Sequence, residues 1–187
     1  RGVLSPADAR LLFAHLLALP GLVTEVLSRE DDVARVARRF AKTRDFFFLG
    51  RHVGFPVALE GALKLKEISY LRAEGYPGGE LKHGPIALIE PGTVVVAVAT
   101  RTPLWARMMD NVSEVRARGA TVVLLANDGH EEAAAQADDV LWVPETHPLF
   151  APIVDVVPLQ LFAYHVARAH GLDVDRPRNL AKTVTVE

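Results

Sequence analysis

Apolar positions follow a helical period up to residue 43 and then alternate between short continuous runs and helical spacing. Ser5 and Pro6 combine a helix cap with a proline suited to the first helical position, and an apolar run follows at 11–19. We expect Pro20-Gly21 to end that helix and residues 22–43 to resume helical periodicity. Residues 1–43 are therefore predicted to form an N-terminal helical segment.

Residues 44–172 read as alternating strands and helices. The runs 45–50 and 93–100 are apolar almost throughout, which is typical of strands buried on both faces. The other expected strands are 71–76, 121–126 and 140–143, and the expected helices are 55–70, 79–89, 104–118 and 149–170. This alternation predicts an α/β fold, a three-layer αβα sandwich around a mostly parallel sheet of about five strands. The last residues, 173–187, form a polar tail.

The expected helix 55–70 carries a charged stripe. Glu60, Lys64 and Glu67 fall on a narrow arc at about 100° per residue, while apolar residues fill most of the remaining circumference. Such a helix should be buried, so its charges should face a cleft, a partner subunit or a paired group. The alternative is an exposed ion-pair ladder, worth about 0.5 kcal/mol or less.

Two other places could hold chemistry. Ligands of parallel sheets lie beyond the carboxyl ends of the strands, which points to residues 50–52 and the equivalent loops. The segment 78–85 (GGELKHGP) presents His83 between glycines, and histidine exchanges protons near neutral pH. A structural histidine fits the same pattern. The acidic residues around 130–139 match no metal-ligand spacing, so we expect a solvated loop and no metal there.

Composition excludes several classes of protein. A formal charge of −2 and a pI near 6.4 give no basic field for nucleic acid or acidic lipid. Without cysteine, the chain has no disulfides, thiol nucleophile or cysteine-bound zinc. The run 93–100 is too short to cross a membrane, and Pro152, Asp155 and Pro158 interrupt the apolar C-terminal stretch. No secretory signal is visible, so we expect a cytoplasmic location and no membrane partner. A first residue of Arg rather than Met suggests a fragment.

Two motifs carry a family resemblance. EGALKLKEISYLRAE with YPGGELKHGP, and the distant DVDRPRNLAKTVTVE, resemble the second sugar-isomerase (SIS) domain of the glucosamine-6-phosphate synthase family. The resemblance spans about 45–187, with both motifs in the family's order. It implies a flavodoxin-like SIS fold and a part in amino-sugar biosynthesis.

The resemblance also implies roles on the charged helix. Glu67 matches the carboxylate base that moves a proton between C1 and C2 of the sugar, and a single base on a rigid helix can reach both carbons. Lys64 matches a supporting lysine that keeps that carboxylate ionised and stabilises oxyanion charge. Glu60 and Ala181 match substrate-binding positions.

Two further matches lie outside that helix. Lys182 corresponds to the lysine that forms a Schiff base with the open-chain ketose, and an imine is a better electron sink than a ketone. His83 corresponds to the imidazole that assists ring opening, which the family supplies from the neighbouring subunit. Without the resemblance, Lys182 would be interpreted as a solvated tail residue.

The family's complete enzyme contains more than this chain. It has a glutaminase domain with a cysteine nucleophile, and a first SIS domain whose serine- and threonine-rich loop binds the sugar phosphate. The resemblance implies a homodimer that binds fructose 6-phosphate, glucose 6-phosphate or glucosamine 6-phosphate, with no cofactor. We expect the chain alone to bind sugar phosphate weakly and to be weakly active or inactive. The alternatives are a glutaminase-free sugar-phosphate isomerase or aminosugar-phosphate deaminase, and a non-enzymatic sugar-phosphate sensor.

Overall fold

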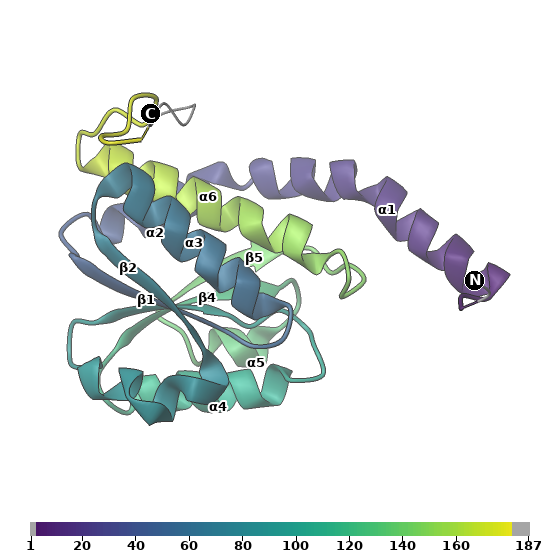
Figure 1. Cartoon of the computed structure of the whole chain (residues 1–187), viewed down its shortest axis with the longest axis horizontal. Helices are drawn as coiled ribbons and strands as arrows, with labels where there is room; N and C mark the ends of the chain where they lie inside the picture. The colour runs from purple at the N-terminus through teal and green to yellow at the C-terminus, as the bar shows by residue number, and fades with distance from the viewer. Residues whose placement is uncertain (1–2, 181–187) are drawn as a thin grey trace, which may run out of the picture.

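A computed structural model describes residues 3–180, in which helices cover both faces of one sheet (Figure 1). The α-helices are α1 (Pro6–Leu27), α2 (Glu30–Arg39), α3 (Gly54–Ser69), α4 (Trp105–Arg116), α5 (Glu131–Ala134) and α6 (Ala151–Ala169). The strands are β1 (Asp45–Gly50), β2 (Arg72–Pro77), β3 (Val94–Val98), β4 (Thr121–Asn127) and β5 (Asp139–Val143). Two 3₁₀-helices, η1 (Gly78–His83) and η2 (Pro85–Leu88), follow β2. The predicted α/β sandwich is confirmed.

The five strands form one sheet in the order β2-β1-β3-β4-β5, and every neighbouring pair is parallel. The strand order reverses direction between β1 and β3, which is the place where α/β proteins usually bind ligands. Parallel strands require a crossover, and each crossover here carries a helix or the two 3₁₀-helices. All the carboxyl ends therefore meet at one edge and the helices run back toward the other.

Two hydrophobic clusters lie on opposite faces of the sheet. One contains alternate residues of β1, β3 and β4 with apolar side chains of α2, α3 and α6, including the edge-to-face pair Phe46–Phe162. The other contains the remaining alternate residues with side chains of α4 and Leu81 of η1. This two-sided burial explains why the strands β1 and β3 are apolar at nearly every position.

The prediction that Pro20-Gly21 ends the first helix is wrong, because α1 continues to Leu27. Leu19 and Val26 are buried in the cluster shared with α6, and this packing holds the helix across the proline. The first turns of α1 extend beyond the rest of the chain (Figure 1). By length and a mean hydropathy of 1.5, α1 could cross a membrane, but a helix that packs on protein meets the same test.

The expected helix 79–89 is also wrong, since the segment forms η1 and η2 instead. Gly84 separates them with φ of 153°, a conformation that L-residues rarely adopt. Pro85 follows and has no N–H to continue a helical hydrogen-bond ladder.

The acidic segment 130–139 differs from the expected solvated loop. It includes the short helix α5. Asp139 is only 8% exposed and forms ion pairs with Arg39 and, at 3.6 Å, with Arg35. This carboxylate therefore ties the start of β5 to α2. Apolar side chains of α2 also pack in the cluster on this face of the sheet.

Candidate active site

The charged stripe on α3 exists as predicted. Lys64 Nζ lies 2.9 Å from Glu67 Oε2 and 3.6 Å from Glu60 Oε1. The three side chains are 28–40% exposed, so they line the surface of the helix instead of an enclosed cavity. One cation between two carboxylates leaves acceptor oxygens available to a ligand on this surface.

The expected burial of α3 on all sides is wrong. Its residues Val57, Ala58, Ala62 and Leu65 are buried, whereas Leu59 and Leu63 are 44% and 41% exposed. The reason is position, because α3 lies over the edge strand β2 and packs on the sheet and α6 with only one face. The exposed leucines border the charged stripe, so part of its surround is an uncovered apolar surface.

The charge state of Lys64 is well defined. Its hydrogen bond to Glu67 raises the pKa of Lys64 above the ordinary value, against the opposing effect of partial burial. The ammonium group therefore stays protonated at neutral pH. It can orient the Glu67 carboxylate and stabilise negative charge that develops beside it.

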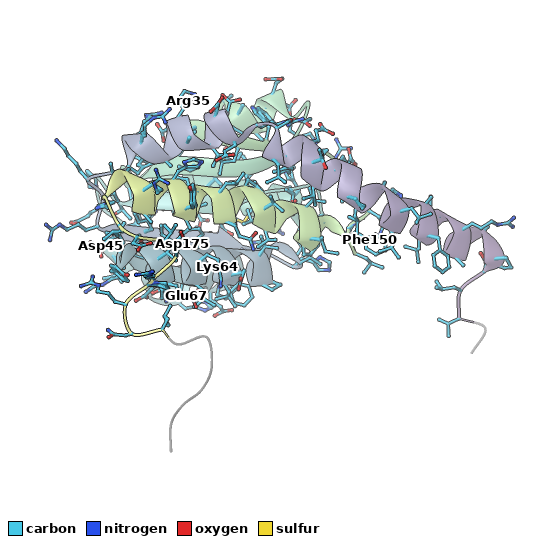
Figure 2. All side chains as sticks on the ribbon, turned by 90° about the horizontal axis from the view of Figure 1, so that it is seen from above. Arg35, Asp45, Lys64, Glu67, Phe150 and Asp175 are labelled. Atoms are coloured by element: carbon cyan, nitrogen blue, oxygen red, sulfur yellow. The ribbon has the colours of Figure 1, made fainter. Side chains whose placement is uncertain are left out.

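The C-terminal segment is fixed to the end of the same helix. Tyr70 caps α3 in the left-handed conformation (φ 61°), and its hydroxyl oxygen accepts a hydrogen bond of 2.8 Å from the backbone N–H of Arg178. The Arg178 guanidinium also lies over the Tyr70 ring, 3.8 Å from the centroid. The segment that carries Asp175 thus passes beside the last turns of α3, near Glu67 (Figure 2). The candidate residues Ala181 and Lys182 lie outside the described residues.

His83 lies apart from the α3 stripe. It ends η1, whose Leu81 belongs to the hydrophobic cluster on the face of the sheet opposite α3. Its side chain is 71% exposed, and its Nδ1 is 2.7 Å from Glu80 Oε2. In neutral His83, a carboxylate at Nδ1 places the proton on that nitrogen and leaves Nε2 as an outward-facing acceptor. Within one chain, the structure brings Glu60, Lys64 and Glu67 together but not His83.

The carboxyl edge of the sheet, the other predicted location, does not hold Glu67. α3 begins at that edge with Gly54 and runs toward the amino edge, so Glu67 in its last turns is far from the loop at 50–52. The strand-end rule therefore does not locate the α3 stripe.

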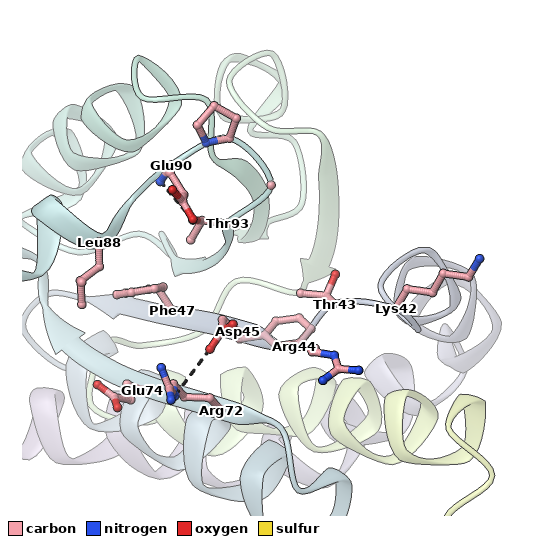
Figure 3. A pocket seen from close by; sticks show the side chains of 13 residues that line it. Lys42, Thr43, Arg44, Asp45, Phe47, Arg72, Glu74, Leu88, Glu90 and Thr93 are labelled. Atoms are coloured by element: carbon pink, nitrogen blue, oxygen red, sulfur yellow. Dashed lines mark hydrogen bonds and ion pairs between the residues drawn. The ribbon is translucent and has the colours of Figure 1, made fainter.

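A cavity of about 570 Å³ opens at the amino ends of β1, β2 and β3 (Figure 3). Its walls carry both charges, including an ion pair between Arg72 and Asp45 at 3.6 Å. None of the four described candidate residues lines it. We therefore assign the cavity no part in the site.

Sequence reasoning assigned no chemical role to a buried carboxyl group, Asp155. It is 1% exposed in α6, and the hydroxyl of Thr100 donates a hydrogen bond of 2.7 Å to its Oδ2. Burial raises the pKa of Asp155 from 3.8 to about 7, and the bond from Thr100 opposes this only in part. The sequence feature that could have indicated this group is an aspartate within an otherwise apolar helical stretch.

Comparison with known proteins defines the class first. The SIS domain family matches residues 39–169, and the chain belongs to this family. Over all its 187 residues the chain is 57% identical to the glutamine–fructose-6-phosphate aminotransferase [isomerizing] of Thermus thermophilus, of which it covers 31%. The chain thus spans about a third of the length of the curated relatives it matches.

Solved structures agree with this relationship. The C-terminal domain of glucosamine-fructose-6-phosphate aminotransferase from Francisella tularensis matches with a TM-score of 0.88 and 38% identity, over 92% of this chain and 49% of that one. A glucosamine-6-phosphate deaminase from Thermotoga maritima matches less well, with a TM-score of 0.63 and 26% identity over 86% of this chain and 48% of that one. The family resemblance drawn from the two motifs is confirmed.

Proposed function

We propose that this chain is the ketose–aldose isomerase part of an enzyme that makes glucosamine 6-phosphate from fructose 6-phosphate and glutamine-derived ammonia. The observation that carries the proposal is the docking of Arg178 on Tyr70, three residues after Glu67. It brings the tail to the helix that holds the candidate base. The relatives' names supply the substrates, and the cytoplasm is the proposed location.

The proposed reaction uses one group for each step. The Lys182 amine condenses with the C2 carbonyl of the open-chain ketose and releases water, and ammonia then displaces the lysine from this imine. Glu67 removes a proton from C1 and returns it to C2. In the same sequence the imine nitrogen gains a proton and the C1 hydroxyl loses one, so that C2 becomes an amine-bearing carbon and C1 an aldehyde. Lys64 holds the Glu67 carboxylate in place at 2.9 Å. Glu60 and the backbone of Ala181 are proposed substrate contacts.

Chain length allows Lys182 to take this part. Lys182 follows Arg178 by four positions, and an extended chain spans at most about 3.6 Å per residue. Helical rise places Tyr70 only about 4.5 Å along the axis from Glu67. A lysine at position 182 is therefore close enough in the chain to the anchored Arg178 to reach the Glu67 carboxylate.

Imine trapping tests this role in a chimeric enzyme in which the chain replaces the matching segment of the Thermus thermophilus relative. Fructose 6-phosphate with borohydride should attach a reduced sugar phosphate to Lys182, read by peptide mass spectrometry. The variant Lys182→Arg should not be labelled, whereas the control Lys66→Arg, an exposed α3 position, should be labelled normally. Labelling that is unchanged in Lys182→Arg contradicts the proposed Schiff base.

We also propose a homodimer in which His83 completes the site of a second copy. Its exposure of 71% and its separation from the α3 stripe support this arrangement. Mixing equal amounts of the inactive chimeras Glu67→Gln and His83→Ala should restore roughly a quarter of the activity, because half the dimers are mixed and each has one intact site. No recovery, with mixed dimers detected by native mass spectrometry, places both residues of a site in one chain.

A further inference from the structure

The 3₁₀-helix that presents His83 is held at its first residue by a close backbone contact. A Cβ atom at Gly78 would lie 2.5 Å from Asn111 Oδ1 and 3.2 Å from Arg51 Nε. Only glycine allows the backbone to approach this pair so closely. The start of η1 is therefore seated directly on a side chain of α4 and on one from the loop after β1.

A network of hydrogen bonds and an ion pair links these side chains to the other end of η1. Arg51 Nε donates to Asn111 Oδ1 at 2.8 Å, and Asn111 Nδ2 donates to Glu114 Oε2 at 3.2 Å. Glu114 Oε1 lies 2.7 Å from Nζ of Lys82, the residue before His83. Burial disfavours the charged form of Glu114, but Lys82 and Asn111 outweigh it and lower the pKa of Glu114. The carboxylate therefore remains ionised and keeps its hold on Lys82.

Asn111 is the central member of this network. It is 3% exposed, and both its amide oxygen and its amide nitrogen are used. Its amide therefore has one orientation, which joins the loop after β1 to the far end of η1.

Because η1 is a 3₁₀-helix, anchoring its ends also sets the direction in which the His83 side chain points. Side chains three residues apart lie on the same side of a 3₁₀-helix. Gly78 and the fully buried Leu81 face inward, while Glu80 and His83 face outward with exposures of 62% and 71%. Fixing Gly78 and Lys82 therefore fixes the side on which the histidine projects.

We infer that Asn111 is a positioning residue for His83, acting through the network Arg51–Asn111–Glu114–Lys82 that clamps both ends of η1. The inference rests on the proposed function, because Asn111 can affect catalysis only if His83 takes part in it. Asn111 is 3% exposed and both of its amide groups are bonded within the protein, so we expect its effect to pass through the geometry of η1.

The test measures kcat and KM in the chimeric enzyme. Asn111→Ala should lower kcat about 10- to 100-fold with little change in KM, because it displaces His83 without removing a substrate contact. In a His83→Ala background the same change should cause no further loss. The matched control is Asp110→Ala, the exposed neighbour on α4, which should leave kcat unchanged.

A second variant pair guards against simple loss of folding. Lys82→Met should lower kcat as Asn111→Ala does. Lys82→Arg, which keeps a cation for Glu114, should have a kcat close to that of the parent. In the 187-residue chain, amide exchange at 78–84 should speed up in Asn111→Ala while the rest of the sheet keeps its protection. If His83→Ala leaves kcat unchanged, the proposed role of His83 and this inference are both wrong, whereas a parent chimera without turnover contradicts the proposed function itself. If His83→Ala is inactive but Asn111→Ala and Lys82→Met have a normal kcat, only this inference is wrong. The same holds if either change lowers kcat further when it is combined with His83→Ala.

Discussion

Replacing Glu67 by Gln in the chimeric enzyme should lower kcat for glucosamine 6-phosphate formation about 10²- to 10⁴-fold, the usual contribution of a general base. The amide can still accept a hydrogen bond from Lys64, which lies 2.9 Å from the carboxylate, so the helix should keep its shape. The amide cannot take a proton from C1. Turnover is measured by chromatography of the product at saturating fructose 6-phosphate.

The matched control is Glu132→Gln, an exposed carboxylate on α5, on the face of the sheet opposite α3. It changes the net charge by the same amount and should leave kcat unchanged. Exchange of the sugar C1 proton with deuterated solvent should stop in Glu67→Gln. If Glu67→Gln retains turnover and exchange, the proposed base is wrong and the sensor interpretation of the SIS domain gains support.

Replacing Asp155 by Asn should stabilise the chain at about pH 8, by up to about 4 kcal/mol. The pKa of Asp155 is raised from 3.8 to about 7, so the unfolded state loses this proton at lower pH than the folded state. The free energy of unfolding of the parent chain should therefore fall as pH rises from about 4 to about 7 and then level off. The amide oxygen of the introduced asparagine, by contrast, can accept the Thr100 hydrogen bond at every pH.

Urea unfolding followed by circular dichroism at about pH 4 and about pH 8 measures this effect. The parent and Asp155→Asn should have similar stability at the lower pH and diverge at the higher one. Asp110→Asn, with its carboxylate 63% exposed, should track the parent throughout. A constant difference between Asp155→Asn and the parent would show that the carboxyl group does not titrate in this range.

The hydrophobic pattern predicted the sheet well because each strand is buried on both faces. β1 and β3 read as unbroken apolar runs, and the helices between strands follow from their periodicity. Local signals failed where tertiary packing or glycine geometry dominates. Pro20 lies inside α1, where the flanking Leu19 is buried in the cluster that includes α6. Gly84 divides a segment for which periodicity predicts one helix.

The candidate site was predictable in its spacing but not in its surroundings. Glu60, Lys64 and Glu67 share an arc in any α-helix, so their contacts follow from sequence. The position of α3 over an edge strand, and the contact between Tyr70 and Arg178, depend on residues far apart in the chain. No helical or strand period carries that information.

The position of α6 has a consequence for synthesis on the ribosome. One face of the sheet is covered in part by Val154, Leu159, Phe162 and Val166 of α6, beside side chains of α2 and α3. These four residues are at most 1% exposed in the finished fold. These residues are translated after every strand. A nascent chain therefore carries its strands with the α6-covered part of that face exposed until about residue 169 has left the exit tunnel. Chaperones that shield apolar surface should matter most during this interval, and slower translation before α6 would prolong it.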